Sequence, residues 1–230
     1  MERESPHAQT LSRGIRMLET LAEAPSPLTI AELAAALDVH RSVAYRVVRT
    51  LEDHGLVARD AAGGVQLAPG LAALARGVSR DLQAAALPAL TAAANALGMT
   101  AFLAVLDRSD VVTLVSVEPS HAHASVAQRP GTRHPLAVGA PGIAIQSILN
   151  AAEWRGLGET PRPETAEAQA RGFATSHDEV IRGLSSVAVP LALPGQPRAT
   201  VAVVYVASGE PVDAIAARLT AAARAIAAEL

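Results

Sequence analysis

Apolar residues recur at helical spacing near the start of the chain. Leu11, Ile15, Leu18 and Leu21 fall on one face of a helix when successive residues are set 100° apart. Ser12 is a candidate N-cap for this helix. The following segment APSPL contains two prolines, which do not fit a helix interior, so the first helix is expected to end there.

The segment TIAELAAAL, residues 29–37, predicts a second, shorter helix. Thr29 precedes the apolar run and Glu32 follows three residues later, which is the spacing of a capping box. Ile30, Leu33 and Leu37 then form the inner face. The tight turn DVH follows, and a third helix begins at Arg41.

The third predicted helix, RSVAYRVVRTLED at residues 41–53, separates apolar and polar residues cleanly. One arc carries Val43, Ala44, Val47, Val48 and Leu51, and the opposite arc carries Arg41, Ser42, Tyr45, Arg46 and Arg49. The segment LVARDAAGGVQLA then predicts two short strands around Gly63 and Gly64. Three helices followed by a hairpin is the order of a winged helix-turn-helix.

The pattern changes from helical to mixed in the remainder of the chain. Residues 69–97 are alanine-rich and helical, with Pro88 indicating a break or kink between a connecting helix and the first helix of a second domain. Strands are predicted in TAFLAVL, DVVTLVSVE, LSSVAVPLAL and ATVAVVYVA, and more weakly in AHASVAQ and HPLAV. A helix is predicted in GAPGIAIQSILN, and a last helix from about Pro211.

Adjacent pairs of strands with helices at both ends predict an α+β fold with an antiparallel sheet. The expected domains are a winged helix-turn-helix over residues 1–68, a connecting helix over 69–86, and a second domain over 87–230. A length of 230 residues is comfortable for two domains, and 50% apolar residues with only 2% aromatic ones predict an aliphatic core.

Composition narrows the setting in which the protein acts. The chain has no cysteine, which excludes disulfides and thiolate chemistry. Its polar first residues, MERESPHAQT, lack the apolar region of a secretory signal, and its most apolar stretch is too interrupted for a membrane span. A cytoplasmic protein without a membrane partner is therefore expected.

Charge bears on whether the third helix binds DNA or is only a solvated helix face. The net charge is −3, and all 19 cations are arginines. Residues 1–76 hold eight arginines and nine acids, 8 − 9 = −1, so a strongly basic domain is absent. The cationic part is the first two turns of the third helix, which is the part of a recognition helix that enters the major groove.

The segment LSRGIRMLETLAEAPSPLTIAELAAALDVHRSVAYRVVRTLEDHGLVARD resembles the N-terminal domain of IclR-type bacterial transcription regulators. RGFATSHDEVIRGLSSVAVPL, residues 171–191, is similar to the C-terminal signature of that family. The resemblance implies a winged helix-turn-helix, a connecting helix and a GAF-like effector-binding domain. It also implies double-stranded operator DNA as a partner, and homodimers or homotetramers. The residues it implies for DNA contact are Ser26, Thr29, Arg41, Ser42, Tyr45, Arg46, Arg49, Arg59, Gly63 and Gly64.

The loop LAVGAPGIA, residues 136–144, offers backbone N–H groups at the start of a helix, which suits a small carboxylate or phosphate. A tight turn with close helix packing explains the glycines equally well. The resemblance implies that this loop borders an effector pocket. The expected lining residues are Ala104, Ser116, Gly139, Ala140, Pro141, Gly142, Ser176, Ser186 and Tyr205.

Departures from the family pattern indicate an unusually apolar pocket. Pro141 has no N–H, Ile143 stands where a lysine is usual, and Ser176 replaces a frequently acidic residue. The expected ligand is a small organic metabolite such as a carboxylate or an aromatic acid. Residues 151–167 are also shorter than in the family, so one or two helices that flank the pocket are expected to be trimmed.

Enzyme chemistry finds little support in the sequence. No nucleophile–base pair is visible, so no catalytic residue and no cofactor are expected. His121, His123 and His134 could approach a metal, but surface histidines near a turn are the favoured interpretation. The alternatives to a ligand-controlled regulator are a small-molecule enzyme, or a protein-interaction module, that carries an appended winged helix.

Overall fold

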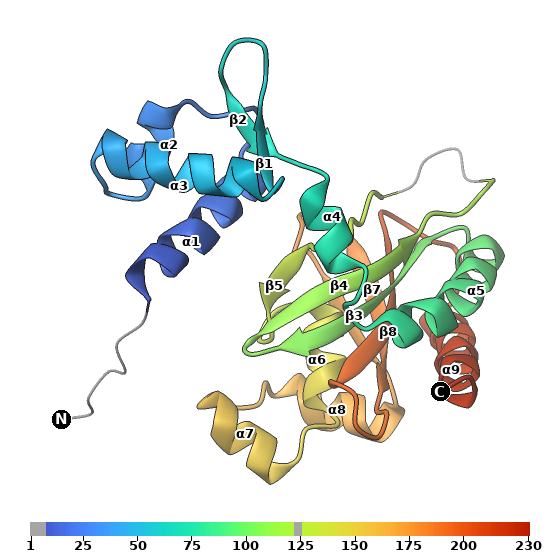
Figure 1. Cartoon of the computed structure of the whole chain (residues 1–230). Helices are drawn as coiled ribbons and strands as arrows, with labels where there is room; N and C mark the ends of the chain where they lie inside the picture. The colour runs from blue at the N-terminus through green and yellow to red at the C-terminus, as the bar shows by residue number, and fades with distance from the viewer. Residues whose placement is uncertain (1–7, 122–125) are drawn as a thin grey trace. The chain divides into compact units, whose positions relative to one another are not determined.

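The computed structural model describes residues 8–121 and 126–230, which form two compact units that meet at the Val78–Ser79 junction (Figure 1). The N-terminal unit has, in chain order, α1 (Gln9–Glu23), α2 (Ile30–Ala36), α3 (Arg41–Asp53), β1 (Val57–Arg59), β2 (Val65–Leu67) and α4 (Gly70–Ala75). The two short strands pair antiparallel, and Leu28 adds an isolated bridge to Val65. This is the predicted winged helix-turn-helix.

Local chemistry explains where the helices of this unit begin. The Thr29 hydroxyl accepts a hydrogen bond from the Glu32 N–H, and the Glu32 carboxylate accepts one from the Thr29 N–H, so the predicted capping box is present. The prediction that Ser12 caps the first helix is wrong, because α1 already begins at Gln9. At α3 the cap is His40, whose Nδ1 accepts from the N–H of Ser42.

The core of the N-terminal unit lies where the three helices meet the wing. Met17 of α1, Leu33 of α2 and Val48 of α3 are fully buried, together with Val57 and Val65 of the hairpin. Each such side chain stabilises the fold by about 1.5–3 kcal/mol relative to an exposed one. The buried arc of α3 thus fixes the direction in which its polar arc faces.

The break in the helical segment after the wing falls earlier than predicted. The structure has α4 and then α5 (Arg80–Leu97), separated by Ser79 in the left-handed backbone region at φ 45°. α5 continues through Pro88, so the predicted break at that proline and the single connecting helix over residues 69–86 are both wrong. Ser79, unlike glycine, gives no sign of a positive φ in the sequence.

The second unit is a six-stranded antiparallel sheet with strand order β5-β4-β3-β8-β7-β6. Its elements after α5 are β3 (Thr100–Asp107), β4 (Asp110–Val117), β5 (Arg133–Pro135), α6 (Gly139–Gln146), α7 (Ala151–Leu157), α8 (Glu164–Arg171), β6 (Ala174–His177), β7 (Ser185–Leu191), β8 (Ala199–Tyr205) and α9 (Val212–Ala228). The predicted α+β class and the four strong strands are confirmed.

Alternation along the central strands divides this unit into two apolar layers. Leu103 and Val201 point to the layer that α5 and α9 cover, whereas Phe102 and Ala202 point to the layer of α6 and α8. Side chains alternate between faces along a strand, so each of these strands is apolar throughout. The α6 layer is the one that holds the predicted ligand loop.

Four segments of this unit were predicted only in part or not at all. The segment in which trimmed helices were expected holds two short ones, α7 with 7 residues and α8 with 8. β6 is a strand that the sequence pattern did not predict. The weakly predicted strand AHASVAQ lies partly outside the described residues, and its residues 126–128 are not in a strand. The other weak prediction, HPLAV, contributes only the last two residues of β5. None of the described helices is long and apolar enough to cross a membrane.

Candidate functional site

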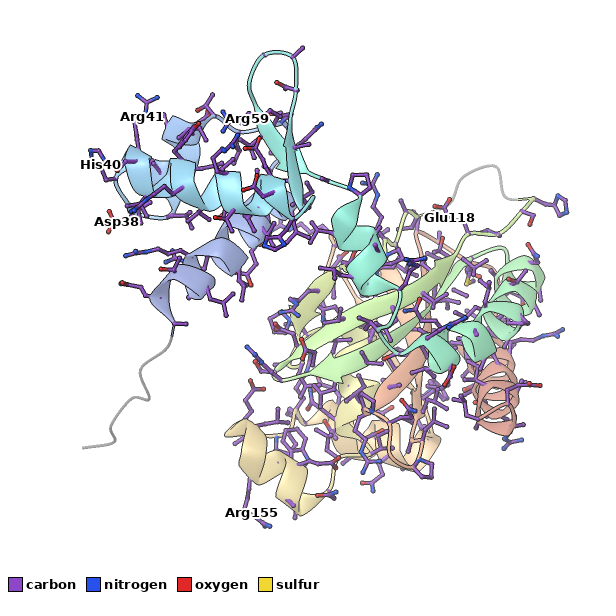
Figure 2. All side chains as sticks on the ribbon, in the orientation of Figure 1. Asp38, His40, Arg41, Arg59, Glu118 and Arg155 are labelled. Carbon is purple, nitrogen blue, oxygen red and sulfur yellow. The ribbon has the colours of Figure 1, made fainter. Side chains whose placement is uncertain are left out.

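The polar arc of α3 is exposed along its whole N-terminal part. Arg41, Ser42, Tyr45, Arg46 and Arg49 all reach the surface, while the valine arc is buried or half-buried. Figure 2 shows Arg41 extending away from the start of α3. Within the described residues, the guanidinium groups of the three arginines make no hydrogen bond or ion pair. They are therefore available to a polyanionic partner.

Tyr45 and Arg59 link α3 to the wing. The guanidinium carbon of Arg59 lies 5.4 Å from the centre of the Tyr45 ring, which is within cation–π range. The Nε of Arg59 also donates to Glu52 Oε1 at 2.9 Å. Arg59 was expected to reach DNA from the wing, but here Glu52 neutralises much of its charge. This ion pair could not be predicted from spacing, because Glu52 lies on α3 and Arg59 lies seven residues later on β1.

The tip of the wing is a turn built around the carboxylate of Asp60. Its Oδ1 accepts from the N–H of Ala62 at 2.9 Å and of Gly64 at 2.8 Å. Gly63, at φ 85°, is exposed. Gly64 is buried, and a Cβ there would lie 2.8 Å from Cβ of Pro27. The expectation that Gly64 faces DNA is wrong, because its N–H is used by Asp60 and close packing requires its lack of a side chain.

The two residues expected to contact phosphate before α2 differ in availability. Ser26 is exposed in the loop that follows α1. Thr29 is exposed as well, but its hydroxyl donates to Glu32 Oε2 at 2.8 Å and accepts from the Glu32 N–H at 3.2 Å. The Thr29 backbone N–H and then its hydroxyl, both donating to the Glu32 carboxylate, hold the pKa of Glu32 below its usual value. A charged carboxylate beside Thr29 disfavours a phosphate at that point.

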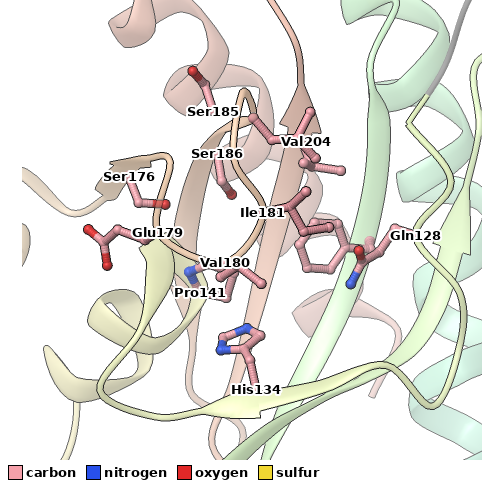
Figure 3. Close-up of a pocket in the computed structure, with 12 residues that line it drawn as sticks. Gln128, His134, Pro141, Ser176, Glu179, Val180, Ile181, Ser185, Ser186 and Val204 are labelled. Atoms are coloured by element: carbon pink, nitrogen blue, oxygen red, sulfur yellow. The ribbon is translucent and has the colours of Figure 1, made fainter. Parts of the chain in front are cut away.

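The second candidate site is a pocket on the α6 layer of the sheet (Figure 3). It contains about 420 Å³ of space between atoms, of which only about 40 Å³ admits the centre of a water molecule. The lining residues are Phe102, Gln128, His134, Pro141, Ser176, Glu179, Val180, Ile181, Leu184, Ser185, Ser186 and Val204. The lining is mostly apolar and has a few polar groups, as is usual for small-molecule sites.

The first N–H groups of α6 are already occupied. The Gly139 N–H donates to Glu179 Oε2 at 2.9 Å, and the Ala140 N–H donates to the Ser176 hydroxyl at 2.8 Å. Pro141, the third residue of the helix, has no N–H. The predicted glycine-rich loop at a helix start is confirmed, but its donors are satisfied from within the chain.

Arg162 holds the other side of the Glu179 carboxylate. Its NH1 donates to Glu179 Oε2 and its NH2 to Glu164 Oε1 at 2.7 Å. The hydrogen bonds that Arg162 donates to Glu164 and to Glu179 raise the pKa of Arg162, so it stays charged. Because this arginine is shared by two carboxylates, it adds no unpaired positive charge to the pocket.

His134 is a polar lining residue that sequence analysis did not assign to the pocket. Its side chain is buried, and its Nδ1 lies 3.1 Å from the carbonyl oxygen of Pro135. Burial lowers the pKa of His134, which favours the neutral ring with Nδ1–H as the donor to that carbonyl. Figure 3 shows the ring turned toward Val180. The Nε2 atom can then accept a hydrogen bond from a ligand.

Six of the nine expected effector-binding residues do not line this pocket: Gly139 and Ala140 begin the helix beside it, and the other four are Ala104, Ser116, Gly142 and Tyr205. Ala104 is buried in the α6 layer and Ser116 lies on β4 opposite Phe102, with its hydroxyl buried and without a partner in the described structure. Gly142 packs under Leu136, where a Cβ would come within 2.2 Å of its carbonyl oxygen. Tyr205 packs in the α5 and α9 layer, and burial raises its pKa. For Ala104, Gly142 and Tyr205 the expectation is wrong.

The structure therefore brings Pro141, Ser176 and Ser186 together at the pocket, with Gly139 and Ala140 beside it. It adds Val180 and Ile181, which lie between GFATSHDE (172–179) and GLSSVAV (183–189), the two segments in which the family resemblance places the far wall of the pocket. Alternation could have identified Phe102, which shares a strand face with Ala104. Nothing in the sequence spacing indicated Gln128 or Glu179.

The described residues contain no group of three or more histidines, aspartates and glutamates that could hold a metal ion. His123, one of the histidines considered for a metal, lies outside those residues. His177 contacts the Ser185 hydroxyl through Nδ1 at 2.9 Å and Asp178 through Nε2 at 3.2 Å. All three belong to one hairpin end, and His177 and Asp178 are well exposed, so these contacts fasten the hairpin rather than form a buried catalytic site.

A winged helix-turn-helix with an exposed arginine face, joined to an α+β unit that has a small-molecule pocket, defines the class of DNA-binding transcription regulators. Residues 10–61 match the IclR helix-turn-helix domain. The chain is 28% identical over 212 residues to the probable transcriptional regulator SauR of Cupriavidus necator, covering 78% of each protein.

Solved structures extend this likeness to the whole chain. An IclR transcriptional regulator from Alicyclobacillus acidocaldarius superposes with a TM-score of 0.84 at 26% identity, over 97% of this chain and 99% of that one. An IclR homologue from Microbacterium hydrocarbonoxydans, solved with 4-hydroxybenzoate, has a TM-score of 0.82 at 23% identity, over 96% and 98%. The chain therefore carries an IclR helix-turn-helix domain and is similar to IclR-type transcription regulators over nearly its whole length.

Proposed function

We propose that the protein binds operator DNA through the first two turns of α3, and that a small organic molecule in the second unit controls this binding. The observation that supports the DNA contact most directly is the set of unpaired guanidinium groups on Arg41, Arg46 and Arg49. Arginine grips guanine or phosphate oxygens, and the Ser42 and Tyr45 hydroxyls add hydrogen bonds to the backbone. Exposed Ser26, Arg59 and Gly63 flank this face and are proposed as weaker contacts.

The proposed effector is a small molecule with an apolar body and a hydrogen-bonding end. Phe102, Val180, Ile181 and Val204 supply an apolar lining, while the neutral His134 offers an acceptor. An aromatic acid that carries a hydroxyl stays within this class, because the hydroxyl can donate to His134 whereas a carboxylate alone can only accept. 4-Hydroxybenzoate, the ligand of the Microbacterium relative, is a suitable first compound, since its ring matches the apolar lining and its hydroxyl can donate to His134.

A DNA-binding titration in the presence of candidate effectors tests this control. A binding duplex is first obtained by in vitro selection with the full-length protein, and its dissociation constant is measured by fluorescence anisotropy. The panel contains 4-hydroxybenzoate, benzoate and phenol. We expect at least one compound to change the dissociation constant, and Phe102→Ala to remove that response. If every compound that raises the melting temperature leaves DNA affinity unchanged, effector control is contradicted.

We propose further that the protein acts as a homo-oligomer with at least two recognition helices. The near-neutral N-terminal unit carries too little positive charge for one copy to bind tightly, so two half-sites about one helical turn apart are needed. Leu11 and Ile15 of α1 are 65% and 49% exposed and line a groove between α1 and α3. This face suits contact with a second copy.

Sedimentation velocity of the full chain tests the oligomer, with the paired variant Leu11→Glu and Ile15→Glu as the perturbation. We expect the wild-type chain to be a dimer or tetramer, and the variant to lose DNA affinity together with a subunit contact. Glu substitutions at Arg13 and Arg16, two other positions of α1, serve as a comparison with greater charge change. A monomeric wild-type protein that binds its selected duplex tightly would overturn the proposal.

A further inference from the structure

We propose that the segment from Asp178 to Leu184, here named the strap, is a lid over the ligand pocket and that Glu179 is the positioning residue that holds it shut. The strap is the loop between β6 and β7, and three of its apolar residues, Val180, Ile181 and Leu184, line the pocket. Val180 and Ile181 are also 46% and 48% exposed. These side chains therefore form a thin cover between the pocket and water.

The strap is fastened to the rest of the unit through one carboxylate. Glu179 accepts from the Gly139 N–H at the start of α6 and pairs with Arg162 in the loop before α8. Val180, the next residue, sits directly on Gly139, because a Cβ on that glycine would come within 2.7 Å of Val180 Cγ2. Breaking the Glu179 contacts would therefore release the cover at the point where it touches α6.

The base of the strap is built to remain closed as a hairpin while its middle moves. The Asp178 N–H donates to the Leu184 carbonyl at 3.0 Å, and the side chain of Asp178 accepts from the Gly183 N–H. His177 and Ser185 contact each other one step further along the pair of strands. Asp178 and Gly183 both have positive φ, at 60° and 80°. The ends of the strap are thus fixed, and only residues 179–182 depend on Glu179.

The cavity under the strap is too small for an organic ligand in this state. A water molecule needs roughly 10–15 Å³ of space for its centre, so the 40 Å³ present holds only a few waters. An apolar cavity that holds benzene has a volume of about 150 Å³, several times the 40 Å³ present here, and the strap side chains line part of this pocket. A ligand must therefore displace the strap, and the Glu179 contacts set how often it opens.

Hydrogen–deuterium exchange on the full-length protein tests the lid without a ligand or DNA. Peptides that cover residues 176–186 contain the protected amides of Asp178, Gly183 and Leu184. In Glu179→Ala we expect the Leu184 amide, which donates to the Ile181 carbonyl in the middle of the strap, to exchange roughly fivefold faster, as for loss of about 1 kcal/mol from a partly exposed ion pair, while the Asp178 amide at the base keeps its wild-type rate. In Glu179→Gln, which keeps an acceptor for Gly139 but loses the ion pair, we expect an intermediate rate.

Glu164→Gln is the matched control, because Glu164 pairs with the same Arg162 but lies on α8 and not on the strap. We expect its strap peptides to exchange at the wild-type rate. Peptides from β8 must stay protected in every variant, which separates local opening from global unfolding. The lid is overturned if Glu179→Ala exchanges like the wild type, or if Glu164→Gln opens the strap equally. This outcome is independent of the effector control on which the biological role of the lid rests.

Discussion

On α3, the guanidinium groups of Arg41, Arg46 and Arg49 reach the surface without a carboxylate partner among residues 8–121 and 126–230, whereas in the second unit Arg162 is held between Glu164 and Glu179. The first arrangement leaves positive charge free on a protein of net charge −3. The second arrangement neutralises its own charges and closes over a small pocket. A DNA duplex would therefore meet unpaired charges on α3, whereas a small molecule would meet a pocket whose charged groups are already paired.

This difference predicts what limits the affinity of each site for its proposed partner. A duplex gains contacts with unpaired arginines and displaces only water and counterions, so its affinity should depend steeply on salt. A ligand of the second unit must compete with contacts that the chain already makes. Because only molecules with an open strap can bind it, its apparent affinity is the intrinsic affinity multiplied by the fraction of molecules in which the strap is open.

The largest expected effect concerns the frame of the pocket. Gly142→Ala places a Cβ within 2.2 Å of the Leu136 carbonyl oxygen, and neither backbone segment can move without disturbing α6. We expect the free energy of unfolding to fall by about 3 kcal/mol. Gly156→Ala on α7, where a Cβ meets no atom within 4 Å, should instead raise it by about 0.5 kcal/mol. Urea denaturation followed by circular dichroism measures both, and equal stabilities would contradict the proposed packing role.

The next largest effect is that of the exposed α3 arginines on DNA affinity. Arg49→Ala and Arg46→Ala should each weaken binding to the selected duplex by about 1–3 kcal/mol, because each removes an unpaired cation from the DNA face. Arg133→Ala is the control, since Arg133 lies in the second unit and pairs with Asp107 and Asp110. Fluorescence anisotropy gives the three dissociation constants. Unchanged affinity in both α3 variants would remove the recognition role of this helix.

A smaller effect is expected at Arg59, beside the polar arc of α3, whose charge Glu52 neutralises. Glu52→Gln removes the carboxylate that binds Arg59 and frees a guanidinium beside Tyr45. We expect DNA binding to tighten by about 0.2–1 kcal/mol. Glu23→Gln at the end of α1 makes the same change of charge away from Arg59 and should have less effect. Weaker binding by Glu52→Gln would show that Glu52 is needed to position Arg59 and Tyr45.

The smallest effect concerns His134 and pH. Burial lowers its pKa in the folded state, so the unfolded chain binds a proton more readily. Stability is therefore full above the unfolded pKa of about 6.5 and declines as pH falls below it. We expect His134→Gln to reduce the loss of melting temperature between pH 7.5 and pH 5.5. An identical loss in both proteins would mean that His134 does not titrate in an apolar pocket.

Much of the fold was predictable because local patterns and burial agree. Helical spacing and the Thr29 capping box predicted α1 to α3, and strongly apolar segments predicted four of the six strands in the second unit. The helix break was misplaced because Pro88 is tolerated within α5, while the chain changes direction at Ser79, a residue that seldom adopts positive φ. Local propensity does not carry that information.

The two candidate sites were predictable to different degrees, because one depends on local spacing and the other on contacts between distant segments. The arginine face of α3 follows from one helix and its periodicity. The pocket depends on contacts between distant segments, such as Glu179 with Gly139, which are 40 residues apart. Tyr205 and Gly142 were misassigned because their sheet face and backbone packing are set by the tertiary fold. Family resemblance located the pocket region but not the strap that closes it.

The central claim is that unpaired arginines on α3 bind a DNA duplex. It is tested most directly by the salt dependence of the dissociation constant for the selected duplex, measured for the wild type and for Arg46→Ala with Arg49→Ala. A steep negative slope of log K against log salt is predicted for the wild type, because phosphate contacts release counterions. The double variant should bind more weakly with a shallower slope. Equal slopes, or no salt dependence in the wild type, would contradict the account.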